Sequence, residues 1–278
     1  MSIKDILVYL DSGAACAERV DVALRIAKSY EARVIGLYVR ALPYVPHFVA
    51  AQIGPDIYET QKRVAEREEV AVRAAFLDRC AAAGMTGEYR ADEGDMTEVV
   101  CLHAKYVDLV VIGQFNPDDD HREGEMGMAD NVVIDAGRPV LVVPYAGSFP
   151  KVGERVMLAW NASRESVRAA HDALPFLKKA SSVEVVAANP QDSEGQHGDI
   201  PCAAICTHLS RHGVPAVAKT VYAEDMNVGA MLLSRAADDG IDLIVMGAYG
   251  RSRFRELILG GVTRHLLNNM TVPVLLSH

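Results

Sequence analysis

Residues Ile241–Asn269 read IDLIVMGAYGRSRFRELILGGVTRHLLNN. The short, almost wholly apolar run Asp242–Met246 is typical of a strand that is covered on both faces, and Gly247 ends it. Further on, Val262–Leu267 is predicted to form a helix. A strand, a glycine loop and a helix N-terminus together form an anion site, because the first helical N–H groups lack partners and the helix dipole is positive there.

Glycines and arginines dominate the predicted loop. Glycine has no Cβ, so its backbone N–H group can approach a ligand closely. The loop and the start of the following helix contain Gly247, Gly250, Gly260 and Gly261. Three cationic side chains that suit phosphate lie between them, namely Arg251, Arg253 and Arg255. We therefore expect a ligand that carries phosphate.

The spacing Gly247-x2-Gly250-x9-Gly260 resembles the nucleotide-binding signature of the universal stress protein family. In that signature a serine or threonine follows the last glycine, whereas this chain has Gly261. A side-chain contact to phosphate is then lost while the backbone donor remains, and Thr263 is the nearest hydroxyl. The resemblance implies that the ligand is ATP or ADP, and it leaves open whether Mg²⁺ accompanies the nucleotide.

An internal repeat organises the rest of the chain. The run Ile6–Asp11 matches Val156–Asn161, and Asp108–Gly113 matches Asp242–Gly247. Pro139-Val-Leu likewise matches Pro273-Val-Leu, and each of these prolines lies equally far beyond the glycine that ends the preceding run. Duplication explains these matches most simply, so the resemblance covers nearly the whole chain as a tandem protein of this family.

Strands and helices alternate along both copies. This alternation predicts an α/β fold with two tandem, doubly wound, parallel five-stranded sheets and helices on both faces. The resemblance implies the Rossmann-like architecture of the adenine nucleotide alpha hydrolases. Ligands of such sheets bind at the carboxyl ends of the strands. We place the copies at residues 1–147 and 151–278.

The two copies differ at the positions that would meet a ligand. After Gly113 the first copy has no second glycine at the family spacing, and it carries three adjacent acids, Asp118, Asp119 and Asp120. These acids would repel a phosphate. We therefore expect the first copy to have a degenerate site and the second copy to bind the nucleotide.

At the end of its first strand, the first copy keeps the family's acidic residue as Asp11, whereas the second has Asn161. The resemblance implies that Asn161 contacts the nucleoside, and capping of the next helix before Ser163 is an equally good interpretation. Trp160 and Tyr249 flank the cleft and could stack on a base, although ordinary packing is commoner. The expected binding residues are Asn161, Gly247, Gly250, Arg251, Arg253, Gly260, Gly261, Val262 and Thr263.

We expect neither a metal site nor a catalytic centre. The acids before His121 lack the spacing of a calcium loop. Cys202, Cys206, His208 and His212 invite a zinc interpretation, but on one helix the cysteine pair would point well away from His208. No residue is an evident general base for water, and no Walker-type lysine follows the glycines.

Composition restricts the class of protein. The 278 residues carry a net charge of −9, which disfavours nonspecific binding to nucleic acid or anionic membranes. No stretch approaches the roughly 20 apolar residues of a membrane helix. Because the five cysteines are odd in number and scattered, and no signal peptide is recognisable, we expect a cytoplasmic protein without membrane or nucleic-acid partners.

The last strand of each copy, Pro139–Pro144 and Val272–Leu276, is apolar. An exposed apolar edge invites pairing, and single-copy members of the resembled family pair through this strand. The two last strands are thus expected to pair antiparallel within one chain. The result would be an intramolecular pseudo-dimer, a pseudo-twofold sandwich of half-domains. This arrangement is also compatible with a homodimer of the whole chain.

Three functions remain after these arguments. The leading interpretation is a stress-response module that binds an adenine nucleotide and acts on an unknown protein partner through its ligand state. The alternatives are a scaffold or small-molecule-binding module of the same fold that holds no nucleotide, and a slow ATP hydrolase. The hydrolase ranks last because catalytic groups are lacking.

Overall fold

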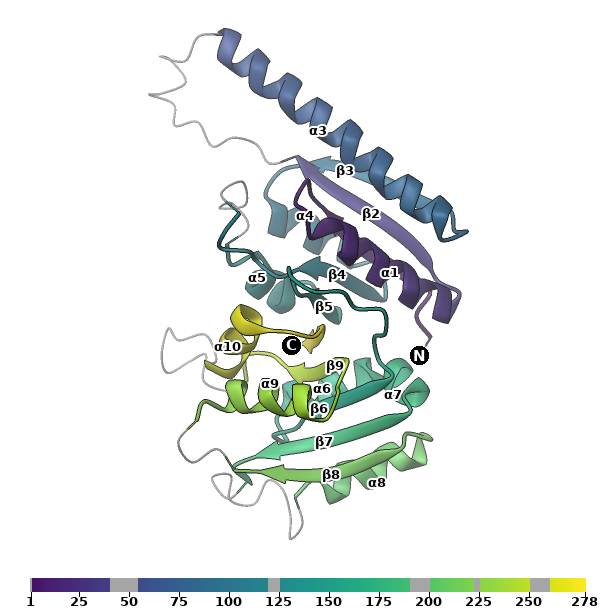
Figure 1. Ribbon diagram of the computed structural model, residues 1–278, viewed down its shortest axis with the longest axis vertical. Helices are drawn as coiled ribbons and strands as arrows, with labels where there is room; N and C mark the ends of the chain where they lie inside the picture. Colours follow the sequence, from purple (N-terminus) through teal and green to yellow (C-terminus); the bar gives the residue numbers. More distant parts are fainter. Residues whose placement is uncertain (1, 41–54, 120–125, 191–200, 223–225, 251–260) are drawn as a thin grey trace.

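A computed structural model of the protein describes residues 2–40, 55–119, 126–190, 201–222, 226–250 and 261–278. One twisted sheet extends through both halves of the molecule (Figure 1). The strands in these ranges are β1 (Asp5–Leu10), β2 (Arg33–Arg40), β3 (Gly87–Glu93), β4 (Leu109–Gly113), β5 (Val140–Val143), β6 (Arg155–Ala159), β7 (Ser182–Ala188), β8 (Ala216–Val221), β9 (Leu243–Gly247) and β10 (Val274–Ser277). Their order is β3-β2-β1-β4-β5-β10-β9-β6-β7-β8, and all neighbours are parallel except β5 and β10.

Helices cover both faces of this sheet (Figure 1). One face carries α1 (Cys16–Tyr30), α3 (Pro55–Ala82), α6 (Arg164–Asp172), α7 (Leu174–Lys179) and α8 (Ala203–Arg211). The other carries α4 (Met96–Ala104), α5 (Met128–Asp135), α9 (Val228–Asp238) and α10 (Gly261–Asn269). The predicted doubly wound α/β fold is confirmed.

Alternation along the central strands divides the core into two layers. On β1, Ile6, Val8 and Leu10 pack on the first helical face, and Leu7 and Tyr9 pack on the second. Successive side chains of a strand point to opposite faces, so a strand covered by helices on both sides must be apolar throughout. This requirement explains the uninterrupted apolar runs of β1, β4 and β9.

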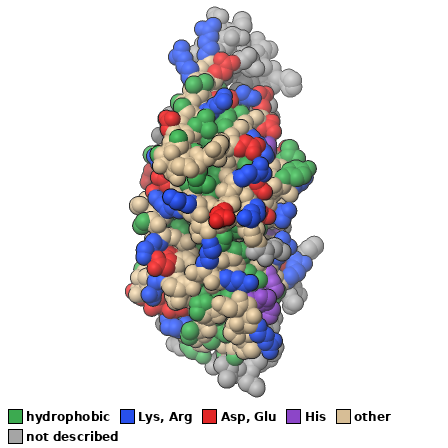
Figure 2. Space-filling model, turned by 90° about the vertical axis from the view of Figure 1, so that its right-hand side faces the viewer, with side chains coloured by type: hydrophobic (Ala, Val, Ile, Leu, Met, Phe, Trp, Pro, Cys, Tyr) green, Lys and Arg blue, Asp and Glu red, His purple; other side chains and the backbone are tan. Residues whose placement is uncertain are grey.

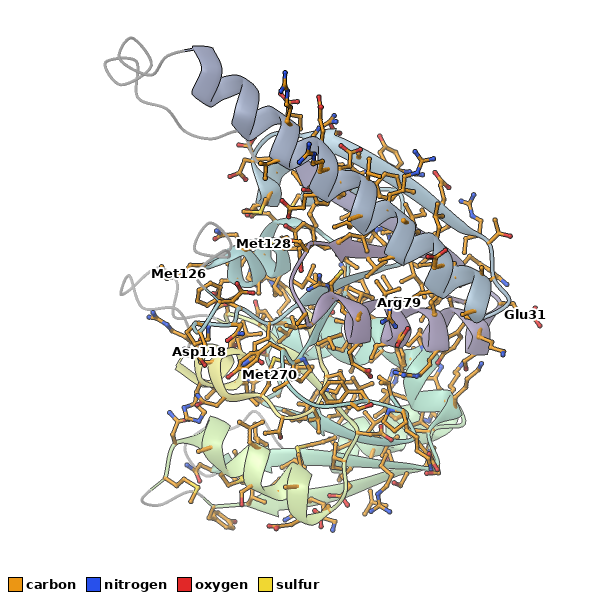
Figure 3. The ribbon with its side chains drawn as sticks, turned by 45° about the horizontal axis from the view of Figure 1, so that its top comes forward. Glu31, Arg79, Asp118, Met126, Met128 and Met270 are labelled. Carbon is orange, nitrogen blue, oxygen red and sulfur yellow. The ribbon has the colours of Figure 1, made fainter. Side chains whose placement is uncertain are left out.

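The helices also contact one another through charged side chains. Figure 3 shows Arg79 of α3 directed toward α1, where its guanidinium donates to Asp21 over 2.7 Å. Acidic and basic side chains are mixed across the face drawn in Figure 2. No helix in the described ranges combines the length and the apolar character that crossing a bilayer takes.

The expected antiparallel pairing of the two last strands is present. Leu141 of β5 lies opposite Leu275 of β10, and both are fully buried. The halves are therefore joined edge to edge in one sheet rather than stacked as a sandwich. Burial of each large apolar side chain at this junction contributes roughly 1.5–3 kcal/mol.

A fragment beginning at Lys151 tests this junction. Without the first copy, the outer edge of β10 loses its partner β5, so we expect the fragment to dimerise or aggregate. Light scattering measures the outcome, with the full chain at equal concentration as the control. A stable, soluble monomer of the fragment would count against the junction as the main reason for tandem association.

In each half, an aspartate links the amino-terminal ends of two neighbouring strands. Asp108 accepts hydrogen bonds from the backbone N–H groups of Lys4 and Asp5, at 2.7 and 3.1 Å. In the second copy, three consecutive N–H groups donate to Asp242, those of Gly153, Glu154 and Arg155, at 2.7, 3.0 and 3.1 Å. Each copy thus fastens the start of its first strand to the start of its fourth.

We expect Asp242→Asn to lower the free energy of unfolding by about 1–3 kcal/mol, because one amide oxygen cannot accept from all three donors. Burial raises the pKa of Asp242 and its backbone donors oppose the rise, so the comparison is made at one pH, near 7. Denaturant unfolding gives the value. Asp238→Asn, the same change at an exposed position of α9, should alter it by less than about 0.5 kcal/mol.

Candidate functional site

A cavity of about 450 Å³ lies at the carboxyl ends of β6, β7 and β9, between α9 and the start of α10. Its volume lies within the roughly 300–1,000 Å³ common for small-molecule sites. The walls combine apolar side chains with glycine backbone and a few polar groups. They comprise Ala159, Trp160, Asn161, Ala162, Ser163, Val186, Ala188, Val228, Leu232, Met246, Gly247, Tyr249, Gly250, Gly261, Val262 and Thr263.

Six of the nine residues expected from the sequence line this cavity: Asn161, Gly247, Gly250, Gly261, Val262 and Thr263. The other three, Arg251, Arg253 and Gly260, lie outside the described residues. The repeat brings Asn161, at the end of the first strand, beside a loop that follows the fourth strand. Trp160 and Tyr249, which the sequence places beside the cleft, both line it.

Position 247 requires glycine for a steric reason that cannot be recognised in the sequence. A Cβ at this position would lie 2.4 Å from two backbone atoms of α6, the carbonyl carbon of Glu165 and the nitrogen of Ser166. Real Cβ atoms do not approach backbone so closely, so glycine is needed here for α6 to pack on β9. This packing role differs from the ligand approach expected of the same residue.

Gly250 and Gly261 have different surroundings. A Cβ on Gly250 would lie 3.3 Å from Oε2 of Glu165, a residue in the first turn of α6. At Gly261, no described residue has an atom within 4 Å of such a Cβ, and this position lines the cavity. Of the two, Gly261 is the glycine whose missing side chain leaves open space.

The start of α10 faces the cavity through Gly261, Val262 and Thr263. Thr263 is buried in the first turn, so a hydroxyl two residues after Gly261 does lie at the cavity wall. The first N–H groups of a helix lack intrahelical partners and carry the positive end of its dipole. This end of the cavity can therefore accept an anion.

Asn161 stabilises the turn that leads into α6. Its side-chain oxygen accepts from the N–H group of Ser163 at 3.1 Å, and the hydroxyl of Ser163 accepts from the N–H group of Ser166 at 3.2 Å. Ser163 is thus the helix cap, and Asn161 supports the turn before it. Lining the cavity and ordering the turn are compatible roles for one amide side chain.

The first copy uses the corresponding strand end differently. Asp11 forms a buried salt bridge with Arg19 and accepts from the N–H group of Gly13 at 2.7 Å. Arg19, only 1% exposed, also donates to the carbonyl oxygen of Tyr9 at 2.8 Å. Ala169 lies as far beyond Asn161 as Arg19 lies beyond Asp11, so the second copy has no such arginine. Arg19 was not predicted as a functional residue, because its signal in the sequence is a single charge on an otherwise apolar helix face.

The loop after β4 contacts the other half of the molecule. Gln114 follows Gly113, and its side chain donates to the carbonyl oxygen of Leu267 in α10 at 2.9 Å. Its oxygen accepts from the N–H group of Tyr145 at 3.2 Å. Of the acidic run, Asp118 is exposed and Asp120 lies outside the described residues. The residue after the strand-ending glycine thus serves the junction between the copies.

The zinc interpretation gains no support from thiol chemistry. Burial raises the pKa of the Cys202 thiol to about 12, which disfavours the thiolate that zinc needs. In the described part of the chain, no three His, Cys, Asp or Glu side chains are grouped as metal ligands.

Tyr249 connects the cavity to the first copy. It lines the cavity, is 4% exposed, and has a left-handed backbone with φ of 53°. Its hydroxyl donates a short hydrogen bond to Asp130 of α5. Tyr249, which follows β9, therefore forms a hydrogen bond across the junction, as Gln114 does after β4.

We expect Tyr249→Phe to lower the free energy of unfolding by about 1–2 kcal/mol, because Asp130 loses a donor while the ring is retained. Denaturant titration followed by circular dichroism provides the measurement. Tyr106→Phe removes the same hydroxyl from a side chain that is 77% exposed, and it should change stability by less than about 0.5 kcal/mol. Equal stability of Tyr249→Phe and the unmodified protein would show that the hydrogen bond contributes nothing net.

These features define a doubly wound α/β protein with a crevice at the carboxyl ends of its strands. The model of the universal stress protein family matches residues 2–144 and again 154–278. The chain therefore belongs to the universal stress protein family, in two copies.

Two curated relatives match locally. Universal stress protein MJ0577 of Methanocaldococcus jannaschii is 40% identical over 40 residues, which are 14% of this chain and 25% of that protein. Universal stress protein Slr1230 of Synechocystis is 47% identical over 38 residues, 14% of this chain and 13% of that protein. The matched stretches thus span a quarter or less of each relative.

Solved structures match over the full length. A universal stress protein from Archaeoglobus fulgidus superposes with a TM-score of 0.78 at 16% identity, covering 99% of this chain and 96% of the other. The protein PA1789 from Pseudomonas aeruginosa gives a TM-score of 0.60 at 14% identity, covering 99% and 92%. At such identities the likeness establishes the fold alone.

Proposed function

We propose that this protein binds one adenine nucleotide per chain, ATP or ADP, in the cavity of the second copy, and that its ligand state acts on a protein partner in a stress response. The observation that carries the proposal is the convergence of the glycine spacing, the start of α10 and a cavity of about 450 Å³ at one strand end. Family membership supports it.

The lining of the cavity suits the two ends of a nucleotide. Apolar residues, among them Val186 and Leu232, offer a surface for a base, and Trp160 adds an aromatic ring. The glycines and the start of α10 lie at the end suited to phosphate, and Arg251 and Arg253 follow Gly250 in the sequence. We propose Asn161, Gly247, Gly250, Arg251, Arg253, Gly260, Gly261, Val262 and Thr263 as the binding residues.

The first copy, residues 1–147, is proposed to bind no nucleotide, and residues 151–278 to form the binding copy. The buried salt bridge of Asp11 with Arg19 supports this division, because it engages the Asp11 carboxylate in an internal ion pair. The five cysteines, odd in number and scattered along the chain, support placing the protein in a reducing compartment, the cytoplasm. A scaffold that holds no nucleotide and a slow ATP hydrolase remain the alternatives.

Gly261→Asp tests the site. It adds a negative charge where a Cβ meets open space, and an acid in the first turn of a helix is compatible with the helix dipole, so folding should persist. We expect calorimetry to give one nucleotide per chain for the unmodified protein and an affinity at least about tenfold lower for the variant.

Asn116→Asp is the matched control, because Asn116 occupies in the first copy the repeat position of Gly250 and the change adds the same charge. Its affinity should equal that of the unmodified protein. An unchanged nucleotide affinity of the Gly261→Asp variant would show that the nucleotide does not bind in this cavity. Absence of any nucleotide binding would favour the scaffold, and ATP turnover above background would favour the hydrolase.

A further inference from the structure

Glu165 is a buried carboxylate that the fold does not explain. It lies in the first turn of α6 and is 5% exposed. Oε1 lies 3.2 Å from the guanidinium of Arg164, whose side chain is 87% exposed and therefore a weak partner. Oε2 is buried and has no hydrogen-bond partner among the described residues. Buried polar atoms without a partner are rare and call for an explanation.

The unpartnered oxygen is buried directly behind two residues that line the cavity. Oε2 is 3.3 Å, and the Ser163 hydroxyl 3.9 Å, from the point where a Cβ on Gly250 would stand. Gly250 and Ser163 both line the cavity. A phosphate held by the glycine backbone would thus approach a carboxylate. Two negative groups at such a distance repel each other unless a cation lies between them.

We propose that Glu165 is a ligand, directly or through one water, of a divalent cation that enters with the phosphates of the nucleotide, so that the site takes the metal complex in preference to the free nucleotide. Mg²⁺ suits this arrangement, because it is commonly held by one or two carboxylates together with substrate phosphates. The inference rests on the proposed function. The first copy has Ala15 as far beyond Asp11 as Glu165 lies beyond Asn161, so it lacks the carboxylate as well as the glycine spacing.

A purely structural role makes a different prediction. An acid in the first turn of a helix favours the helix through its dipole, whatever binds nearby. In that case a neutral replacement lowers thermal stability but leaves the response to metal unchanged. The ratio of nucleotide affinities with and without Mg²⁺ therefore separates the two roles.

The experiment measures ATP binding by calorimetry in Mg²⁺ and in a chelator at equal ionic strength. For the unmodified protein we expect Mg²⁺ to raise the affinity at least about tenfold. Glu165→Gln should reduce this ratio to about threefold or less, and it should bind metal-free ATP more tightly than the unmodified protein does. Arg164→Gln, a change to the exposed neighbour on the same turn, should keep the full ratio.

An unchanged ratio in Glu165→Gln overturns the proposal, as does an unmodified protein that binds ATP equally with and without Mg²⁺. In both cases the nucleotide site itself stands. If the unmodified protein binds no nucleotide under either condition, the proposed function falls and this inference with it. Circular dichroism verifies folding. If Glu165→Gln does not fold, Glu165→Leu removes the charge at a similar side-chain volume, and an unchanged ratio there overturns the proposal equally.

Discussion

The antiparallel pairing of β5 with β10 is the contact on which the rest of the molecule depends. Each copy alone ends in a fully buried apolar strand, and such a strand needs a partner at its free edge. Pairing the two edges in one chain closes both and makes one ten-stranded sheet in the described structure. The junction also brings the loop after each fourth strand within reach of the other half, where Gln114 and Tyr249 form hydrogen bonds.

Duplication leaves two copies of each strand end, and only one copy needs to keep a ligand site. In the first copy Arg19 neutralises Asp11 from within the core, an arrangement that costs desolvation and is repaid only by good geometry. The second copy has Ala169 and Asn161 at the corresponding positions, and Asn161 lines the cavity of about 450 Å³, whereas the cavity beside Asp11 in the first copy measures about 320 Å³. The difference between the copies is thus a difference in what satisfies the polar groups at the strand ends.

Much of the fold could be predicted from the sequence, because it follows from local patterns. Apolar runs such as Asp108–Gly113 predict strands, their repetition predicts two copies, and the apolar last strands predict the junction. Part of the candidate site also follows, since the spacing of Gly247, Gly250 and Gly260 depends only on neighbours in the chain. The roles of Gly247 and Arg19 could not be predicted, because each depends on a contact between elements whose distance the sequence does not state.

Tyr249 offers a physical route from the cavity to the other half of the molecule. Its ring lies at the cavity wall and its hydroxyl bonds Asp130 on α5, so a shift of its strained backbone must alter one contact or the other. A ligand influences assembly only through contacts that differ between the bound and free states. Tyr249 contacts both the cavity and the junction, so such a difference would change the contacts of this side chain. Gly250 is the next residue in the chain, and a Cβ there would lie 3.3 Å from Oε2 of Glu165, so the contact to the junction and the approach to this carboxylate come from adjacent residues.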